Sequence, residues 1–352
     1  MRAIGLMSGT SLDGCDAAYV VTDGRGQVEP GPALTLPYDK DFRARLRGVL
    51  GGQGDVAAVE RDLTDRHAEA VSLLRSRHGI DAVDLVGFHG HTILHRPREG
   101  RTWQIGDGAR LAALTGIDVV ADFRSADVAA GGEGAPLVPL YHRALAGALE
   151  RPLAVLNVGG VANVTWIGAG EDDILSFDTG PGNALVDDWL LRHTGSAVDW
   201  DGALAGRGRI DESFVKAFLA DPYFERVPPK SLDRDDFARH VPAGLSPEDG
   251  AATLTAMTAT AVAAASRHFP APVRRWLVTG GGRHNPTLMA MVAARLGLPA
   301  APVEAVGWDG DALEAQAFAY LAVRSIAGLP LSLPSTTGAK EATCGGRLHR
   351  AH

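Results

Sequence analysis

The chain has 352 residues, of which 45% are hydrophobic, so it is long enough for two domains with ordinary buried cores. A net charge of −8 without a visible basic stripe argues against nucleic-acid binding, and two cysteines, Cys15 and Cys344, argue against a disulfide framework or a cysteine-rich metal site. No apolar run approaches ~18 residues, and the start MRAIGLMSGTSLDG lacks the apolar core of a signal peptide. We therefore expect a soluble cytoplasmic protein with no membrane partner.

Predicted strands and helices alternate over the first third of the chain. The predicted strands are apolar runs beside turn residues, at 3–7, 15–22, 84–89, 103–107 and 118–122. The strand at 84–89 is expected to end in a His-Gly-His turn. The predicted helices show apolar residues at helical spacing, at 38–50, at 56–78 and in a short segment ending at Thr115.

The glycine- and proline-rich segment 131–136 precedes a second series of elements. Its predicted strands are 153–157, 161–167 and 276–279, and its predicted helices are 140–149, 251–269, 286–296 and 311–326. The segment 222–247 is expected to be irregular. The hairpin at 153–167 resembles the one at 3–22, which suggests an internal duplication. We expect one domain over 1–130, joined by the tail 331–352, and a second over 131–330.

Four glycine-rich turns follow or close predicted strands: LMSGTSLDGCD (6–16), LNVGGVAN (156–163), SFDTGPGN (176–183) and LVTGGGRHN (277–285). Without a Cβ atom, such turns let backbone N–H groups approach phosphate oxygens closely. No lysine follows a glycine, so a Walker A loop is absent, and no G-x-G-x-x-G stands between a strand and a helix. A single turn of this kind usually only packs, but four together favour a nucleotide-dependent phosphotransferase of another class.

Asp187 is the candidate general base. The run Gly180–Asn183 predicts the start of a helix with Asn183 at its N-cap, which places Asp187 about one turn in, where the helix dipole favours a carboxylate. The alternative is that Asp187 and Asp188 both lie on a solvated face, and Asp188 is expected to face water. Asp13, Asp16 and Asp178 are candidates to hold Mg²⁺, or are simple turn residues.

Three further side chains are candidates for substrate contacts. His89 lies two residues from His91, but no third metal ligand stands nearby, so hydrogen bonding to substrate or backbone is favoured. Arg124 could bind an anionic group through its forked donors, or could be a surface arginine. Glu314 stands among small apolar residues and is either functional or at a helix edge.

These motifs resemble the anhydro-N-acetylmuramic acid kinase family, of the acetate kinase/sugar kinase/Hsp70/actin superfamily. The resemblance runs nearly end to end, through GLMSGTSLDGCD (5–16), GFHGHT (87–92), QIGD (104–107), TGIDVVADFRSADVAAGGEGAPLVP (115–139), LNVGGVANVT (156–165), SFDTGPGNALVDDW (176–189), PKS (229–231), TGGGRHN (279–285) and EAQAFAYLA (314–322). It implies an α/β fold of two actin-like domains with ribonuclease H-like mixed sheets flanked by helices, and ATP in the cleft between them.

The resemblance also implies an activity. Such an enzyme is a phosphotransferase with an alcohol group as acceptor, which uses ATP and Mg²⁺. It opens the 1,6-anhydro ring of anhydro-N-acetylmuramic acid with water and phosphorylates O6, giving N-acetylmuramate 6-phosphate in peptidoglycan recycling. The expected partner is therefore a small anhydro amino sugar, and a homodimer is expected because homodimers are common in the family.

The resemblance implies roles for Asp187 and for the run Gly9–Asp16, and the other expected contacts come from the residues described above and from the shared motifs. Asp187 is the base toward the water that attacks C1, and Asp13 and Asp178 are the Mg²⁺ candidates. Substrate contacts fall on His89, Thr92, Gln104, Arg124 and Glu314. ATP contacts fall on the glycine turns, at Gly9, Thr10, Ser11, Leu12, Asp13, Gly14, Cys15, Asp16, Asn157, Gly159, Gly160, Asn163, Gly280, Gly281 and Gly282.

The chain departs from the family pattern in two places. The usual HGQT reads His89-Gly90-His91-Thr92, and if His91 touches substrate, affinity would depend on pH near the imidazole pKa of ~6.5. The stretch 232–239 differs from the usual Thr-Gly-x-Glu-x-Phe-Asn, although Lys230 and Ser231 remain. Two alternatives stay open: a kinase for another 1,6-anhydro sugar such as 1,6-anhydroglucose, and a non-catalytic, nucleotide-gated sensor of wall fragments.

Overall fold

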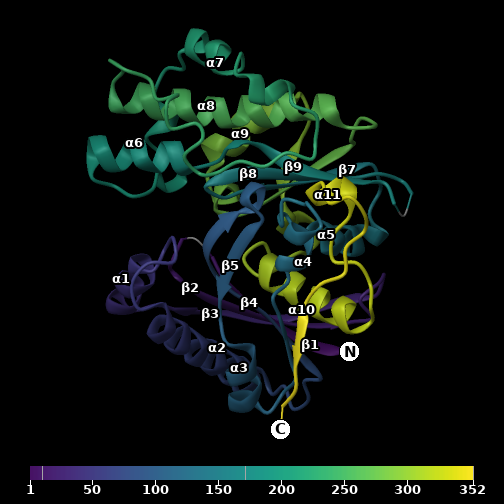
Figure 1. The fold of residues 1–352 in the computed structure, drawn as a ribbon. Coiled ribbons are helices and arrows are strands. Elements are labelled where there is room, and N and C mark those ends of the chain that lie inside the picture. The colour runs from purple at the N-terminus through teal and green to yellow at the C-terminus, as the bar shows by residue number, and fades with distance from the viewer. Residues whose placement is uncertain (10, 171, 352) are drawn as a thin grey trace. The chain divides into compact units, whose positions relative to one another are not determined.

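The computed structural model describes residues 1–9, 11–170 and 172–351. The chain forms two compact units (Figure 1). Unit 1 comprises Met1–Ala148 and Ala312–His352, and unit 2 comprises Leu149–Asp311. Among the helices of the described residues, none has both the length and the apolar character that a membrane span requires.

Unit 1 is built on a mixed sheet of seven strands. The strand order is β12-β6-β4-β1-β2-β3, and β5 pairs with β4 beside this path. The strands β1, β2 and β3 are successively antiparallel, whereas β4 and β6 run parallel to β1. The bounds are β1 (Arg2–Ser8), β2 (Gly14–Thr22), β3 (Val28–Pro37), β4 (Leu85–Arg96), β5 (Arg101–Ile105), β6 (Val119–Ala121) and β12 (Arg347–His349).

Helices cover both faces of this sheet. The helices of unit 1 are α1 (Lys40–Gly48), α2 (Val56–His78), α3 (Gly108–Thr115), α4 (Ser125–Ala129), α5 (Pro139–Leu145), α10 (Leu313–Ile326) and α11 (Pro334–Thr337). Ile4 and Leu6 of β1 share a buried cluster with residues of α1, α2 and α3. Gly5 between them points to the other face, because side chains alternate along a strand. There α10 packs on the sheet, as Figure 1 shows.

The position of α10 explains why the units differ from the expected domains. A Cβ atom at Gly5 would overlap the carbonyl oxygen of Ala315, and one at Gly87 would overlap that of Phe318. The backbone of α10 thus lies directly on β1 and β4, at two glycines that leave room for it. For this reason α10 belongs to unit 1, as does α5, and the boundaries fall at 148/149 and 311/312 rather than at 130/131 and 330/331.

Unit 2 repeats the same plan with five strands in the order β11-β10-β7-β8-β9. Again the first three strands in sequence are antiparallel neighbours and the next two run parallel to the first. The bounds are β7 (Leu153–Val158), β8 (Val161–Ile167), β9 (Ile174–Pro181), β10 (Arg275–Thr279) and β11 (Ala300–Pro302). This repeated order confirms the predicted duplication and the two mixed, ribonuclease H-like sheets.

The helices of unit 2 are α6 (Ala184–Thr194), α7 (Glu212–Phe218), α8 (Pro247–Ala265) and α9 (Pro286–Leu296). Val262 of α8 and Val292 of α9 pack on one face of the sheet, against Leu156, Val164 and Phe177. A second cluster joins α6, α7 and α8 to the aromatic residues of segment 222–240. Short 3-10 helices are η1 (Pro97–Glu99), η2 (Ala146–Ala148), η3 (Trp200–Gly202), η4 (Ala205–Arg207), η5 (Pro222–Glu225), η6 (Ser266–His268), η7 (Gly281–His284) and η8 (Val303–Val306).

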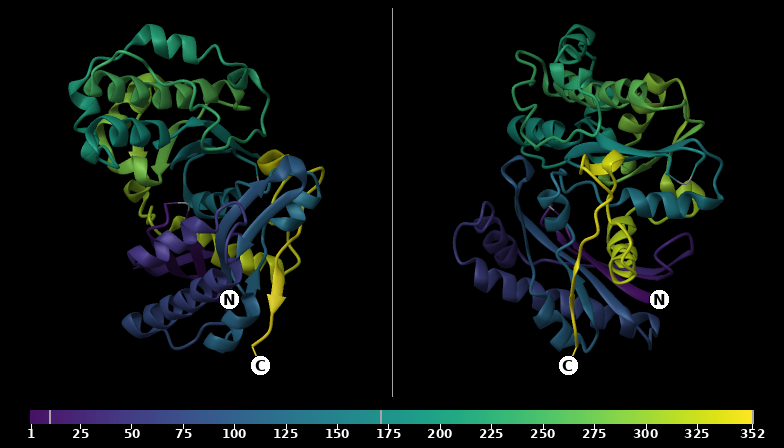
Figure 2. Two further views of the ribbon diagram at one scale, coloured as in Figure 1. Left: turned by 60° about the vertical axis from the view of Figure 1, so that its left-hand side comes forward. Right: turned by 45° about the vertical axis from the view of Figure 1, so that its right-hand side comes forward.

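One predicted strand end was wrong. The strand β4 does not stop at His89 but continues to Arg96, because Gly90 adopts a φ of 73° inside the strand and residues 91–96 pair with β5. Glycine tolerates this backbone conformation at little cost. The C-terminal tail ends as the edge strand β12, which pairs with β6 (Figure 2).

Candidate active site

The loop between β1 and β2 presents polar groups at its surface. The hydroxyl of Ser11 donates to Oδ1 of Asp13 at 2.6 Å, and both side chains are exposed. The N–H of Leu12 donates to the carbonyl of Gly9 at 3.1 Å, and Leu12 takes a φ of 59°. A left-handed conformation costs energy for a non-glycine residue, so the surrounding turn must hold it. Thr10, also expected at the nucleotide site, lies outside the described residues.

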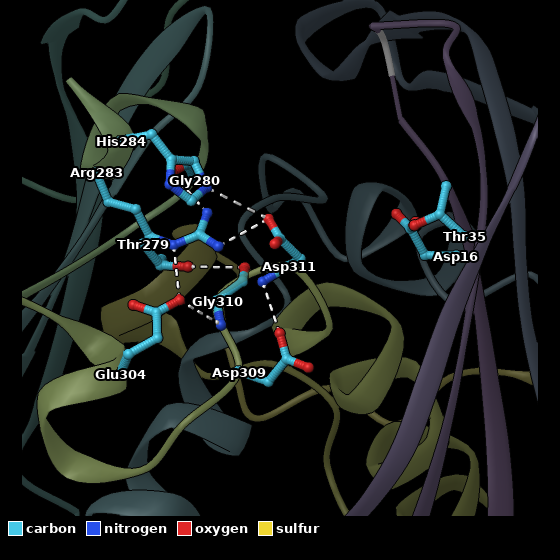
Figure 3. Close-up of polar contacts among 10 residues, drawn as sticks. All are labelled: Asp16, Thr35, Thr279, Gly280, Arg283, His284, Glu304, Asp309, Gly310 and Asp311. Atoms are coloured by element: carbon cyan, nitrogen blue, oxygen red, sulfur yellow. Dashed lines mark hydrogen bonds and ion pairs between the residues drawn. The ribbon is translucent and has the colours of Figure 1, made fainter. Parts of the chain in front are cut away.

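Two other expected ATP contacts beside this loop have their side chains engaged elsewhere. Cys15 is fully buried in the unit 1 core, and this burial raises the pKa of its thiol. The carboxylate of Asp16 accepts a hydrogen bond from Oγ1 of Thr35 on β3 at 2.5 Å (Figure 3). Gly14 packs closely on β3, since a Cβ atom there would lie 2.7 Å from the carbonyl oxygen of Leu36.

A row of polar residues crosses four strands of unit 2. Thr279 of β10 is the register partner of Asn157 on β7, Asn157 pairs with Asn163 on β8, and Asn163 pairs with Asp178 on β9. Residues directly opposite each other on neighbouring strands project from the same face of a sheet. The structure therefore brings together three of the residues predicted from the sequence. Thr279 was missed, although it stands directly before the glycine run 280–282.

Asp178 holds the segment that contains the Pro-Lys-Ser motif (229–231) through hydrogen bonds. Its N–H donates to the carbonyl of Lys230 at 2.9 Å, and its Oδ2 accepts from the N–H of Leu232 at 2.8 Å. The hydroxyl of Tyr223 donates to the carbonyl of Asp178 at 2.5 Å. Lys230 is itself buried, donates to the carbonyls of Tyr223 and Phe224, and has its pKa lowered by burial to about 8.

Neither Mg²⁺ candidate lies in a preformed cluster of ligands. In the part of the chain that the structure describes, no three His, Cys, Asp or Glu side chains are grouped so that they could hold a metal. Mg²⁺ usually keeps several waters and takes only one or two carboxylates together with substrate phosphates. The exposed carboxylate of Asp13 fits that requirement better than Asp178, which already binds the backbone of Leu232.

The glycine turn after β7 positions the start of α6. The carbonyl of Gly160 accepts from the N–H of Gly182 at 2.9 Å, and that of Gly159 accepts from the N–H of Asn183 at 2.8 Å. A Cβ atom at Gly182 would overlap the carbonyl oxygen of Gly159. Asn183 does precede the helix, but its side chain does not cap it, because Nδ2 instead reaches toward the carbonyl of Val158 at 3.4 Å.

Asp187 lies in the first turn of α6, partly buried. Burial raises the pKa of its carboxyl to about 6, with Asp188 and Asp199 acting in the same direction and Arg234 opposing them. The helix dipole was expected to favour the carboxylate form at this position, but the loss of solvent around the carboxyl group raises its pKa. A carboxylate with a pKa near 6 is well suited to take a proton near neutral pH.

Asp188 points to the surface, as expected, but it is not simply solvated. Arg234 donates to both of its carboxylate oxygens, from Nη2 at 2.7 Å and from Nη1 at 3.1 Å. Arg234 belongs to the stretch that departs from the family pattern, so this ion pair gives that stretch a definite place beside the candidate base.

In unit 1, His89 and Arg124 lie together. Nδ1 of His89 is 3.0 Å from the carbonyl of Gly90, and Nε2 accepts from Nε of Arg124 at 3.0 Å. The proton must therefore sit on Nδ1, and burial with the nearby guanidinium lowers the pKa of His89, which is neutral. Arg124 also donates to the carbonyl of Gly134 at 2.7 Å. Burial lowers the Arg124 pKa to about 10, opposed by the charge of Glu314, so Arg124 remains a cation.

Gln104 and Thr92 also lie together, since Nε2 of Gln104 donates to Oγ1 of Thr92 at 3.1 Å. Gln104 and His89 both line a cavity of about 270 Å³ in unit 1, with Asp122 and the tail residues Arg347 and His349. Asp122 takes a φ of 57°, a conformation that a non-glycine residue adopts only where its surroundings enforce it. Four of the five predicted substrate contacts thus form two hydrogen-bonded pairs, and the fifth, Glu314, is exposed at the start of α10.

His91 does not line this cavity. It is fully buried, its Nδ1 lies 3.0 Å from the hydroxyl of Ser8, and that hydroxyl accepts from Tyr38 at 2.9 Å. Burial lowers the pKa of His91 to about 4. The hypothesis of a pH dependence near 6.5 at this position was therefore wrong. A ring enclosed by the core is already neutral well below pH 6.5, so its charge does not change near that pH.

Arg283 organises the glycine turn after β10, and the sequence analysis missed it. Its buried guanidinium donates to Glu304 at 2.9 Å, to Asp311 at 2.8 Å and to the carbonyl of Gly280 at 3.1 Å. Figure 3 shows the guanidinium between the two carboxylates. The ion pairs tie the turn to the segment that leads out of unit 2. A Cβ atom at Gly280 would overlap the side chain of Asn157, so this turn also packs against the polar row.

Comparison with known proteins gives consistent matches over the whole chain. The family model described as anhydro-N-acetylmuramic acid kinase matches residues 1–351. The chain is 61% identical to a protein of that name from Paramagnetospirillum magneticum and 55% identical to one from Rhizorhabdus wittichii, with 99% of each chain covered in both cases. Among solved structures, component A of (R)-2-hydroxyglutaryl-CoA dehydratase from Acidaminococcus fermentans shares the fold, with a TM-score of 0.50 at 13% identity over 93% of this chain and 99% of that one.

Proposed function

Because the chain belongs to the anhydro-N-acetylmuramic acid kinase family, we propose that Asp187 activates the water that opens the 1,6-anhydro ring while O6 receives the γ-phosphoryl group of ATP. The enzyme is a phosphotransferase acting on an alcohol group of a sugar. Its substrate is 1,6-anhydro-N-acetylmuramic acid, and its product, N-acetylmuramate 6-phosphate, belongs to peptidoglycan recycling.

The observation that carries the proposed mechanism is the environment of Asp187. Its partial burial near the start of α6 places the pKa at about 6, so that the carboxylate is mostly ionised at neutral pH yet basic enough to accept a proton. A solvated aspartate with a pKa of ~3.9 would be a much weaker base.

Water adds its oxygen to C1 and gives one proton to the carboxylate of Asp187. The bond between C1 and O6 breaks, and O6 forms a bond to the γ-phosphorus as the bond from that phosphorus to the leaving ADP oxygen breaks. Phosphoryl transfer needs positioning and charge neutralisation rather than covalent chemistry from the protein, which the remaining residues can supply.

For the nucleotide, we propose that the β1–β2 loop binds phosphate oxygens through its backbone N–H groups and through the exposed Ser11 hydroxyl, which would exchange its hydrogen bond to Asp13 for one to phosphate. The polar row of unit 2 and the turn Gly280–Gly282 are proposed to bind the rest of ATP. Asp13 would hold Mg²⁺ directly or through water, and the ion would neutralise phosphate charge. The proposal rests on the exposure of Ser11 and Asp13 and on the pairing of Asn157 with Asn163 and Thr279.

We propose that the sugar binds in the cavity lined by His89 and Gln104. Arg124, which is hydrogen-bonded to His89, would supply the positive charge. The neutral His89 and the carbonyl of Gly134 fix the guanidinium of Arg124 through Nε and Nη1, and we propose Nη2 as the donor to an anionic group. We also propose that the enzyme is a homodimer in the cytoplasm. Light scattering after gel filtration tests the oligomeric state.

The decisive experiment uses ATP, Mg²⁺ and 1,6-anhydro-N-acetylmuramic acid in ¹⁸O-labelled water, with mass spectrometry of the product. A sugar phosphate with one labelled oxygen is expected. The Asp187→Asn variant should lose about 10²- to 10⁴-fold in kcat while keeping its fold, because an amide cannot accept the proton. Near-normal turnover of Asp187→Asn would refute the role of Asp187, and equal efficiency on 1,6-anhydroglucose would refute a dedicated muramate site.

A further inference from the structure

The charges that act on Asp187 are two carboxylates, those of Asp188 and Asp199, and one guanidinium, that of Arg234. On its own helix, Asp188 is the next residue. From the segment after β9, Arg234 approaches with its guanidinium, which also lies 3.1 Å from Asp235. From the segment before η3, Asp199 contributes a third carboxylate. Arg234 is therefore the one cation among the described groups whose charge acts on Asp187.

The two neighbouring carboxylates are held very differently. Asp199 is buried, and its oxygens accept from the N–H groups of Leu204 at 2.8 Å and Ala205 at 3.0 Å, so its charge is anchored by the backbone. Asp188 has 45% of its side chain exposed and depends on Arg234, which is itself 52% exposed. The bidentate geometry of this pair fixes the guanidinium on Asp188, the residue that follows the base in α6.

An exposed ion pair of this kind contributes little to stability, typically about 1 kcal/mol or less. The effect of the pair on the pKa of a neighbouring carboxyl group is separate from its contribution to the free energy of unfolding. A cation near a carboxylate favours the ionised form, and an anion disfavours it. Without Arg234, Asp188 would lose its cationic partner, and its negative charge would stand uncompensated beside Asp187.

We propose that Arg234 is a positioning residue for catalysis, which pairs with Asp188 and thereby sets the lower pH limit at which Asp187 can act as a base. This inference rests on the proposed role of Asp187. It also gives a function to the stretch 232–239, whose sequence departs from the family pattern.

The test is the pH profile of kcat/KM for anhydro-N-acetylmuramic acid in wild type, Arg234→Gln, Asp188→Asn and the double variant. Arg234→Gln should move the acid limb upward by about half a pH unit, so that activity at pH 5, relative to each plateau, falls about threefold below wild type. Asp188→Asn should move the limb downward. The double variant, which loses one charge of each sign, should return close to wild type.

Ionic strength provides a second readout. Because the pair is exposed, salt at about 0.5 M should reduce the shift caused by Arg234→Gln. Circular dichroism and thermal unfolding establish that each variant is folded, and Asp188→Asn keeps the test valid even if Arg234→Gln is unstable.

The outcomes separate this inference from the proposed function. If Asp187→Asn is inactive but Arg234→Gln and Asp188→Asn keep the wild-type midpoint, Asp187 remains the base and the role of Arg234 is refuted. A uniform loss of activity at every pH in Arg234→Gln would likewise overturn it. If Asp187→Asn is active, the proposed function fails first.

Discussion

His91 should make unit 1 sensitive to mild acid, and His91→Gln tests this. The folded protein holds its imidazole at a pKa of about 4, whereas an imidazole in the unfolded chain has a pKa of ~6.5. Between these values the unfolded chain binds more protons than the folded one, so the free energy of unfolding increases with pH. The stability contribution of neutral His91 is complete above pH ~6.5 and is lost as the pH falls towards 4.

The size of the effect follows from the two pKa values. On going from pH 7 to pH 5, the unfolded state gains about 2 kcal/mol relative to the folded state from this one group. His91 has no exposed surface, so solvent does not screen the effect. Glutamine does not titrate, and His91→Gln should therefore lose about 2 kcal/mol less than wild type over the same interval. His67 and His142, also buried with pKa values of about 4, are present in both proteins and cancel in the comparison.

Unit 1 can be followed separately from unit 2 by urea titration at each pH, with a brief deuterium pulse read on peptides from β1 and β4. His78→Gln is the matched control, because His78 is exposed at the end of α2 and its ring is in water in both states. If His91→Gln shows the same difference in unfolding free energy between pH 7 and pH 5 as wild type, burial of a neutral imidazole is not the cause.

Two further substitutions test the turns that position the site. Gly182→Ala should destabilise unit 2 by about 1–3 kcal/mol and lower kcat, because the added methyl group would overlap the carbonyl of Gly159 and displace the start of α6. Its control, Gly281→Ala, adds a methyl group with no atom within 4 Å, and a comparable loss of stability there would show that steric overlap is not the reason. Arg283→Met should raise the Kd for ATP at least several-fold, because the turn at Gly280 loses its link to Glu304 and Asp311. Calorimetric titration measures this, and Arg295→Met, which removes the ion pair between Arg295 of α9 and Glu212 of α7, should bind ATP as wild type does.

Local patterns in the sequence predict much of the fold. The helix at 56–78 has the predicted bounds because apolar spacing, the Asp55 cap and Gly79 at its end agree with each other. The strand β3 was missed because its segment Val28–Pro37 contains three prolines and a glycine, which an edge strand accommodates but a central strand does not.

The candidate site is harder to predict, because it depends on contacts between distant residues. The glycine turns and Asp187 stand out in the sequence, but nothing near Arg234 or Arg283 shows which carboxylates they meet, 46 and 28 residues away. Burial is equally invisible: His91 looks like a titrating surface group until the strands around it are placed. Spacing alone also could not show that Asp187 would be partly buried, with its pKa raised by that burial.

The close contact of α10 with Gly5 and Gly87 has a consequence for synthesis on the ribosome. Synthesis of unit 1 begins first, but its helix α10 lies after residue 311. Residues 1–148 therefore emerge from the ribosome without the helix that covers one face of their sheet. Unit 2 is continuous in sequence and is finished first. At translation rates of about 5–20 residues per second, the first segment waits roughly ten to thirty seconds for its missing helix, with an apolar sheet face uncovered and open to chaperones.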